Sequence, residues 1–254
     1  MKARWRIGLR ALPLLLTSSA VASVYDVVAD FSATNNPTGT WSYGSTASLG
    51  GFDLYTAVIP GSDGASPVWL RNPAELFVGP LVWKNLGAPA YGVPTGKVSL
   101  HPGPTDFSGV RWTSPESGLA TVTGAFGAGD IGLVSVWILQ DSSIIFQTSG
   151  AASTEAFALT TLVAPGTTVD FVVGNFDGIF ADNTPLSATI SVVPEPSCIG
   201  AAALLSLMAF RRRSTGPTQP SPRKGAVSQR LMAQGSRFAR AQFERRNSLW
   251  IIIT

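Results

Sequence analysis

Oxygen-bearing side chains gather in the segment VDFVVGNFDGIFADN, residues 169–183. Asp170, Asn175, Asp177 and Asp182 supply carboxylate and amide oxygens, the ligand type that calcium prefers. The segment is not an EF-hand loop, because no glutamate follows at the required offset. The Asn-x-Asp-Gly pattern that starts at Asn175 is also an ordinary turn signature. The sequence therefore indicates either a calcium site formed by these four residues or a turn without metal.

Large aromatic side chains suggest a second kind of site. A ring with one exposed face can stack on the apolar face of a sugar while its polar edge stays in water. Trp41 and Tyr43 lie in the polar segment TGTWSYGST, which favours partial exposure. Trp112 and Trp137 lie in apolar segments and are expected in the core. We therefore predict that Trp41 and Tyr43 are the ligand-binding rings.

The supply of nucleophiles and bases argues against catalysis. His101 is the only histidine, so any histidine-based metal centre or Ser-His-Asp triad would need it. It is followed by Pro102 and Pro104, and this rigid turn favours a structural hydrogen bond from the ring to the loop. Cys198, the only cysteine, has no base nearby in the sequence. We predict a protein that is not an enzyme and needs no cofactor, calcium apart; a secreted glycoside-active hydrolase using paired carboxylates stays the alternative.

The distribution of charge excludes a polyanionic partner. The whole chain has a formal net charge of +3, but residues 23–193 contain four basic and thirteen acidic residues, a net charge of −9. A strongly acidic domain repels nucleic acid. The basic residues lie at the two ends of the chain, where they can set the orientation of membrane segments.

The pattern of residues 23–193 is that of an all-β protein. Short apolar or alternating segments are separated by Gly, Pro, Asn and Asp, and no sustained helical period occurs. We predict one domain, residues 23–191, folded as an antiparallel two-sheet β-sandwich of jelly-roll type. The expected strands are 25–31, 52–59, 76–83, 98–101, 110–112, 119–126, 133–139, 143–148, 156–162, 168–173 and 186–193.

The first 22 residues have the features of a secretory signal peptide. Lys2, Arg4 and Arg6 open a positive region, residues 11–16 are apolar, and Ala20 and Ala22 provide the small residues that signal peptidase accepts. Cleavage is expected after Ala22, and signal peptidase is the implied partner. The alternative is an amphipathic helix that remains in the cytoplasm.

Residues 192–213 combine three features in a fixed order. The sequence VVPEPSCIGAAALLSLMAFRRR has a Pro-Glu-Pro triplet, thirteen uncharged residues at 198–210, and an arginine cluster. Arginines that follow an apolar segment stay on the cytoplasmic side of a membrane. The apolar run is shorter than the roughly 20 residues that span a bilayer. Its alternative interpretation is a buried apolar strand or helix followed by a basic tail.

This combination resembles the PEP-CTERM sorting signal of bacteria. The resemblance implies that the apolar run is a transmembrane helix, that the protease-transpeptidase exosortase is a partner, and that the anchor is removed during sorting. Members of the family usually end just after the arginines, whereas this chain continues. The sorting motif that the resemblance implies consists of Pro194, Glu195, Pro196, Arg211, Arg212 and Arg213.

Residues 214–254 form a basic extension that begins with the proline-rich stretch TGPTQPSPRK. Such a composition cannot form a packed core, so we expect a disordered tail. A cytoplasmic arm on anionic lipid and a misjudged stop codon remain the other interpretations.

The domain itself is similar to a β-sandwich that recurs in exported PEP-CTERM proteins and resembles jelly-roll carbohydrate-binding modules. The similarity lies in the segments DFSATNNPTGTWSYG, HPG, VRWTSPESG and VDFVVGNFDGIFADNTPLSATI. Members of this group lack an established activity, so the similarity implies the fold and an exported location: a protein anchored to the inner membrane in transit and then displayed at the cell surface or in the extracellular matrix. Extracellular polysaccharide is the expected ligand, and a purely structural matrix role is a further alternative.

Overall fold

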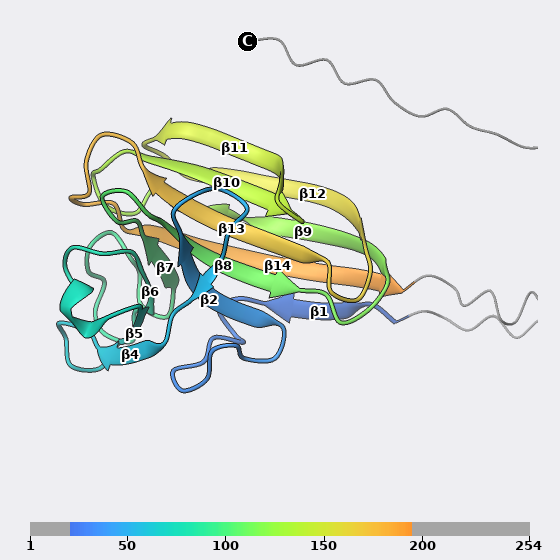
Figure 1. The fold of residues 1–254 in the computed structure, drawn as a ribbon, viewed down its shortest axis with the longest axis horizontal. Coiled ribbons are helices and arrows are strands. Elements are labelled where there is room, and N and C mark those ends of the chain that lie inside the picture. The colour runs from blue at the N-terminus through green and yellow to red at the C-terminus, as the bar shows by residue number, and fades with distance from the viewer. Residues whose placement is uncertain (1–20, 195–254) are drawn as a thin grey trace, which may run out of the picture. The chain divides into compact units, whose positions relative to one another are not determined.

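The computed structural model describes residues 21–194, which form two antiparallel β-sheets packed face to face (Figure 1). The predicted two-sheet antiparallel sandwich is thus confirmed. A short 3₁₀ helix, η1 (Pro73–Glu75), lies between β5 and β6. The strands are β1 (Ser23–Asp26), β2 (Trp41–Thr46), β3 (Asp53–Leu54), β4 (Ala57–Pro60), β5 (Pro67–Leu70), β6 (Leu81–Lys84), β7 (Val98–His101), β8 (Phe107–Thr113), β9 (Gly118–Phe126), β10 (Val134–Gln140), β11 (Ser143–Ala151), β12 (Glu155–Val163), β13 (Thr168–Asn175) and β14 (Thr184–Pro194).

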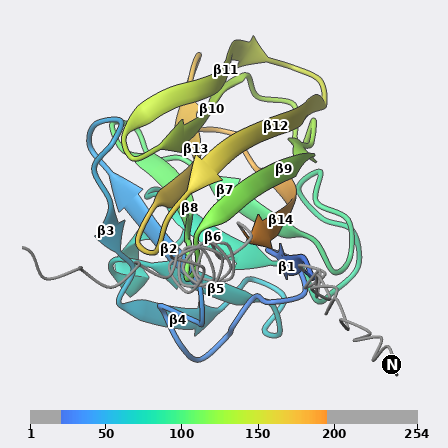
Figure 2. The same ribbon diagram turned by 90° about the vertical axis from the view of Figure 1, so that its right-hand side faces the viewer.

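The strand order is that of a jelly roll with an added lobe. One sheet has the order β12-β9-β14-β7-β6-β5-β4, and β1 also pairs with β14. The other sheet has the order β11-β10-β13-β8-β2-β3. Strands β7 to β14 distribute over the two sheets as in a double Greek key. Viewed from the end where β1 begins and β14 ends, β4 lies on the side of the molecule opposite β11 (Figure 2).

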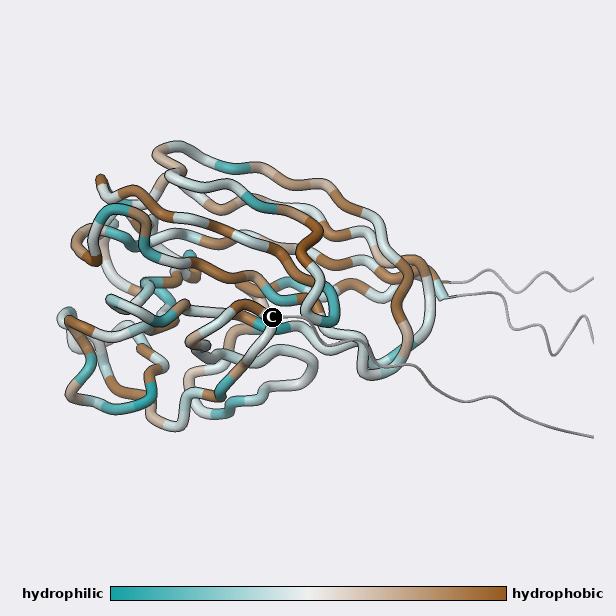
Figure 3. The backbone as a smooth tube through the Cα atoms, turned by 45° about the horizontal axis from the view of Figure 1, so that its top comes forward, coloured by the Kyte–Doolittle hydropathy of each residue, from teal (hydrophilic) through white to brown (hydrophobic). Residues whose placement is uncertain are grey.

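Alternation of buried and exposed residues places the core between the sheets. In β14 the side chains of Leu186, Ala188, Ile190 and Val192 are buried, while the residues between them are partly exposed. This is the period of two that a half-buried strand requires. Apolar residues recur along the strands of both sheets (Figure 3). A separate small apolar cluster lies under the β4–β7 lobe and contains Val68, Leu70, Leu81, Trp83 and Val93.

Several predicted strands differ from the observed ones. The expected strand 25–31 stops at Asp26, because the Asp26 carboxylate accepts hydrogen bonds from the backbone amides of Val28 and Ala29 and starts a turn. The segment 52–59 is divided into β3 and β4, and only the end of 76–83 is extended, as β6. Strands β2 and β5 were not predicted. Strand β2 is buried along its whole length, so it lacks the alternation that would have identified it.

The predicted targeting segments lie mostly outside the described residues. The transmembrane helix, the arginine cluster, the basic tail, and Glu195 and Pro196 of the sorting motif lie outside the described residues, as does the signal peptide except for its last two residues. Strand β14 extends to Pro194, which pairs with Gly118, so the sheet includes the first three residues of the predicted sorting segment. Within residues 21–194 we find no helix with the length and apolar character needed to cross a membrane.

Candidate functional site

A cavity of about 400 Å³ opens at one end of the sandwich. One wall is formed by the β4–β7 lobe, and the other by the loop that follows β13. Both lie at the same end of the molecule, on the left in Figure 1. A cavity of this volume is in the range typical of small-molecule sites. Its lining combines apolar rings with a few polar side chains.

Aromatic side chains form much of the cavity wall. Trp83 lies on β6 and is 8% exposed, and Tyr91 packs edge-on against it with 6.4 Å between ring centroids. Tyr91 has a φ of 52° and is 54% exposed, so a left-handed turn holds this ring outward. Phe77 and Phe180 face the cavity from opposite walls and are also largely exposed. These rings offer apolar faces to a ligand.

Hydrogen bonds fix the deeper part of the wall. The Trp83 indole Nε1 donates to Asn183 Oδ1 at 2.9 Å, which joins the lobe to the loop after β13. Asn85 is buried; its Nδ2 donates to the carbonyl oxygens of Ala88 and Val93, and its Oδ1 accepts from the Gly87 amide. The loop that carries Tyr91 is therefore tied to β6 by one side chain.

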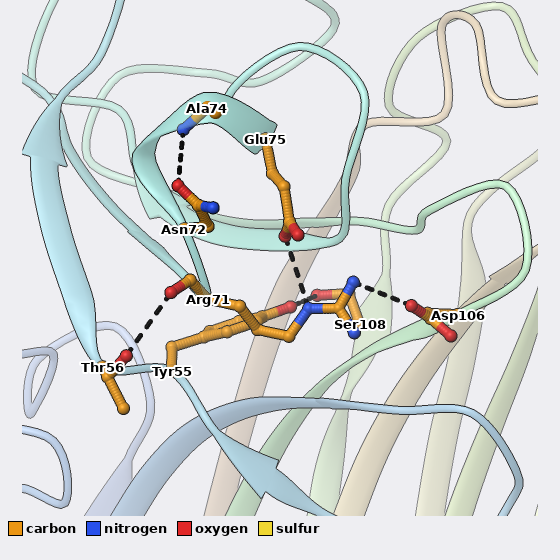
Figure 4. A network of polar contacts seen from close by, with 8 residues as sticks. All are labelled: Tyr55, Thr56, Arg71, Asn72, Ala74, Glu75, Asp106 and Ser108. Atoms are coloured by element: carbon orange, nitrogen blue, oxygen red, sulfur yellow. Dashed lines mark hydrogen bonds and ion pairs between the residues drawn. The ribbon is translucent and has the colours of Figure 1, made fainter.

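An ion-pair network supports the wall that carries Phe77 (Figure 4). Arg71 contacts Glu75 of η1 at 3.3 Å and Asp106 at 2.8 Å. Asn72 caps η1, since its Oδ1 accepts from the Ala74 amide. The network thus holds η1, and the phenylalanine two residues beyond it, against the rest of the domain.

The cavity lining includes two carboxylates, Asp63 and Asp130, and one histidine, His101. Asp63 accepts hydrogen bonds from the Ser66 hydroxyl and amide and from the Ala65 amide, and these bonds lower the pKa of Asp63. Burial lowers the pKa of His101, whose Nδ1 donates to the Pro102 carbonyl at 2.7 Å. This bond is the structural role that the sequence indicated. Asp130 also lines the cavity, and no lysine or arginine is among the lining residues within 21–194.

The predicted ligand-binding rings are not exposed. Trp41 and Tyr43 are 1% and 0% exposed and belong to the main core between the sheets. The Trp41 indole Nε1 donates to Asp30, and the Tyr43 hydroxyl accepts from the Ser32 amide. The expectation of partial exposure is therefore wrong, because the polar residues around these rings are themselves buried in β2. Trp112 is in the core as predicted, whereas Trp137 is only partly buried.

The four predicted calcium ligands are not gathered into one cluster. The Asp170 carboxylate forms a bidentate pair with Arg111 on the neighbouring strand β8, at 2.6 and 2.7 Å. Asn175 accepts from the Gly178 amide, as in a turn, and Asp177 accepts from the amide of Leu133, which lies 44 residues earlier in the chain. Asp182 is buried without a hydrogen-bond partner. Among residues 21–194, no three Asp, Glu, His or Cys side chains converge as metal ligands.

Three exposed rings of the candidate site, Phe77, Tyr91 and Phe180, were missed by the sequence analysis, which placed Phe77 in the expected strand 76–83. All three lie in short loops bounded by Gly, Pro or Asp. An aromatic residue in such a loop has no strand in which to bury its ring, and this signal could have identified them.

Comparison with known proteins gives only remote likenesses. No protein-family model and no curated protein matches the sequence. Among solved structures, the CBM51 from Clostridium perfringens GH95 in complex with methyl-galactose is 12% identical; the match covers 66% of this chain and 99% of that one, with a TM-score of 0.30. A native family 35 carbohydrate binding module from Clostridium thermocellum is 12% identical, with 55% and 98% covered and a TM-score of 0.28. Rabbit GITRL is also 12% identical, with 34% and 74% covered and a TM-score of 0.28. We base no function on likenesses this distant.

Proposed function

We propose that this chain is an exported protein, sorted through a PEP-CTERM signal, that binds extracellular polysaccharide and does not catalyse a reaction. The observation that supports binding is the aromatic cavity between the β4–β7 lobe and the loop after β13. Its exposed rings, Phe77, Tyr91 and Phe180, offer apolar faces beside the hydrogen-bonding side chains of Asp63 and Asp130. Sugar recognition uses this combination of stacking and polar contacts.

The charge of the cavity narrows the class of sugar. Asp63 and Asp130 line it, and the described lining contains no lysine or arginine to offset them. The carboxylates would repel a uronic acid but can accept hydrogen bonds from sugar hydroxyls. A neutral polysaccharide is therefore the preferred ligand of this proposal.

The cavity rings provide the direct test of binding. Tyr91→Ala and Phe180→Ala should each weaken binding to a neutral polysaccharide about 5- to 10-fold, because stacked rings contribute about 1 to 1.5 kcal/mol. Affinity gel electrophoresis with a panel of soluble neutral and acidic polysaccharides measures this effect. Phe176→Ala is the matched control, since Phe176 is 54% exposed and does not line the cavity.

The outcomes separate the three classes of function. Binding that depends on Tyr91 and Phe180, without release of reducing sugar, supports the proposal. Release of reducing sugar would instead favour the glycoside-active hydrolase. Absence of binding across the panel would leave the structural matrix role.

Export and sorting are tested at the two ends of the mature chain. In a host with exosortase, mass spectrometry should find a mature protein that begins at Ser23 and lacks the arginine cluster. Replacing Pro194, Glu195 and Pro196 by alanine should leave the C-terminal segment attached, because the resemblance makes these residues the recognition motif. An intact, unprocessed wild-type chain in the cytosol would contradict this part of the proposal.

A further inference from the structure

Asp182 is a buried carboxylate without a partner. The residue is 1% exposed, and neither side-chain oxygen has a hydrogen bond within the described residues. Burying a charged carboxylate without donors is strongly unfavourable, so such a group either takes up a proton or is given a compensating partner. The geometry around Asp182 shows what kind of group would fit.

Oxygen atoms converge beside Gly132. The position that a Cβ atom would take on Gly132 lies 2.1 Å from Asp182 Oδ1 and 2.8 Å from the carbonyl oxygens of both Phe180 and Ala181. Three oxygens from the loop after β13 therefore lie around the Gly132 Cα, where the side chain of any other residue would collide with them. The loop is held in place by the Gly132 amide, which donates to the Ala181 carbonyl at 2.8 Å.

The surroundings of Asp182 are negative. Burial is the main cause that raises the pKa of Asp182, and the nearby charges of Asp177 and Asp130 raise it further. One oxygen of Asp177 accepts a hydrogen bond from the Leu133 amide, and one oxygen of Asp130 accepts from the Ile131 amide. The second oxygen of each carboxylate is not used in these bonds. In the ion pairs of residues 21–194, Arg71 and Arg111 are paired with acids other than these three aspartates. The two arginines therefore do not neutralise the charge around Asp182.

We propose that Asp182 is the anchoring ligand of a calcium site. Phe180 and Ala181 contribute carbonyl oxygens, water completes the shell, and Asp130 and Asp177 balance the charge. Calcium accepts six to eight oxygens in flexible geometry, including backbone carbonyls and water. Because no three acidic, histidine or cysteine side chains converge here, the described residues do not form the nitrogen or sulfur site that zinc requires.

A calcium ion at this position would also act on the cavity. Ile179 and Phe180 line the cavity and are adjacent to the proposed ligands in the sequence. Fixing the loop would fix the Phe180 ring, so calcium should strengthen polysaccharide binding. This coupling rests on the proposed function, whereas the calcium site itself does not.

Thermal unfolding with calcium tests the site without any sugar. A site with one buried carboxylate resembles weak extracellular calcium sites, so we expect a Kd of about 0.1 to 1 mM. After treatment with EDTA, the purified chain should gain about 3 to 6 °C in Tm when free Ca²⁺ is about tenfold above Kd. Magnesium should give a smaller rise, because it keeps most of its water and requires near-octahedral geometry. KCl at matched ionic strength should give none.

Two charge-matched variants decide the assignment. Asp182→Asn should lose the calcium-dependent rise in Tm, while Asp53→Asn, which removes an exposed carboxylate on β3, should keep it. Without calcium, Asp182→Asn should unfold at or above the wild-type temperature, since an amide is less costly to bury than a charge. Should Asp182→Asn fail to fold, Asp177→Asn replaces it, with a reduced calcium response as the expected result.

The site is overturned if the wild type shows no rise beyond the KCl control, or if Asp182→Asn keeps the full rise. A calcium response in a protein that binds no polysaccharide would support the site and reject the proposed function. Polysaccharide binding without any calcium response would support the proposed function and reject the calcium site.

Discussion

Replacing Trp41 with alanine is expected to lower the free energy of unfolding by about 3 to 5 kcal/mol, the range for removing a large aromatic side chain from a core. Trp41 is 1% exposed, lies opposite Trp112 in the pairing of β2 with β8, and packs at 6.3 Å from Phe171 of β13. The alanine variant would leave a void between the sheets that neighbouring strands cannot fill. Chemical denaturation monitored by circular dichroism measures the loss.

Trp41→Phe is the matched control for this prediction. It keeps most of the ring and loses the 3.1 Å hydrogen bond from the indole Nε1 to Asp30, so we expect a loss of about 1 to 2 kcal/mol. Molecules of either variant that remain folded should bind polysaccharide as the wild type does, because Trp41 lies away from the cavity lining. Unchanged stability together with selective loss of sugar binding would show that this indole is a ligand-binding ring after all.

The sequence predicted the fold class and most of the long strands because their side chains alternate. In β9 and β14 every second residue is apolar or small and faces the core, which makes the period of two visible. Strand β2 was not predicted, because WSYGST is buried on both faces and includes the polar residues Ser42 and Ser45. Polar composition suggested exposure there, but tertiary packing overrode it, and the error about Trp41 and Tyr43 has the same cause.

The candidate site was less predictable, because it depends on contacts between distant segments. Trp83 and Asn183 are 100 residues apart and meet through one hydrogen bond. The loop after β13 was singled out for its oxygen ligands, and the structure leaves Asp182 of that loop as the carboxylate that lacks a partner. No spacing rule could show that Asp170 faces an arginine, since the register of β13 against β8 sets that contact.

Because Asp170 is paired with Arg111, replacing it is expected to destabilise the fold and to leave calcium binding unchanged. Asp170→Asn should lower the free energy of unfolding by about 3 kcal/mol, because it leaves the Arg111 guanidinium without its bidentate partner. This is the lower end of the range for breaking a buried pair, since the Arg111 side chain remains 23% exposed and 4.4 Å above the Phe52 ring. The calcium-dependent rise in Tm should persist in this variant.

A double-mutant cycle with Arg111→Met separates the coupling free energy of the Asp170–Arg111 pair from the contributions of the surrounding residues. Removing both charges should be less destabilising than the sum of the two single changes, because no unpaired charge then remains between the strands. Denaturant titrations of the wild type, both single variants and the double variant give the coupling free energy directly. A coupling below about 0.5 kcal/mol would mean that the two side chains act independently. Loss of the calcium response in Asp170→Asn would mean that this carboxylate, rather than Asp182 alone, contributes to cation binding, and the strand register would then have to differ from the one described.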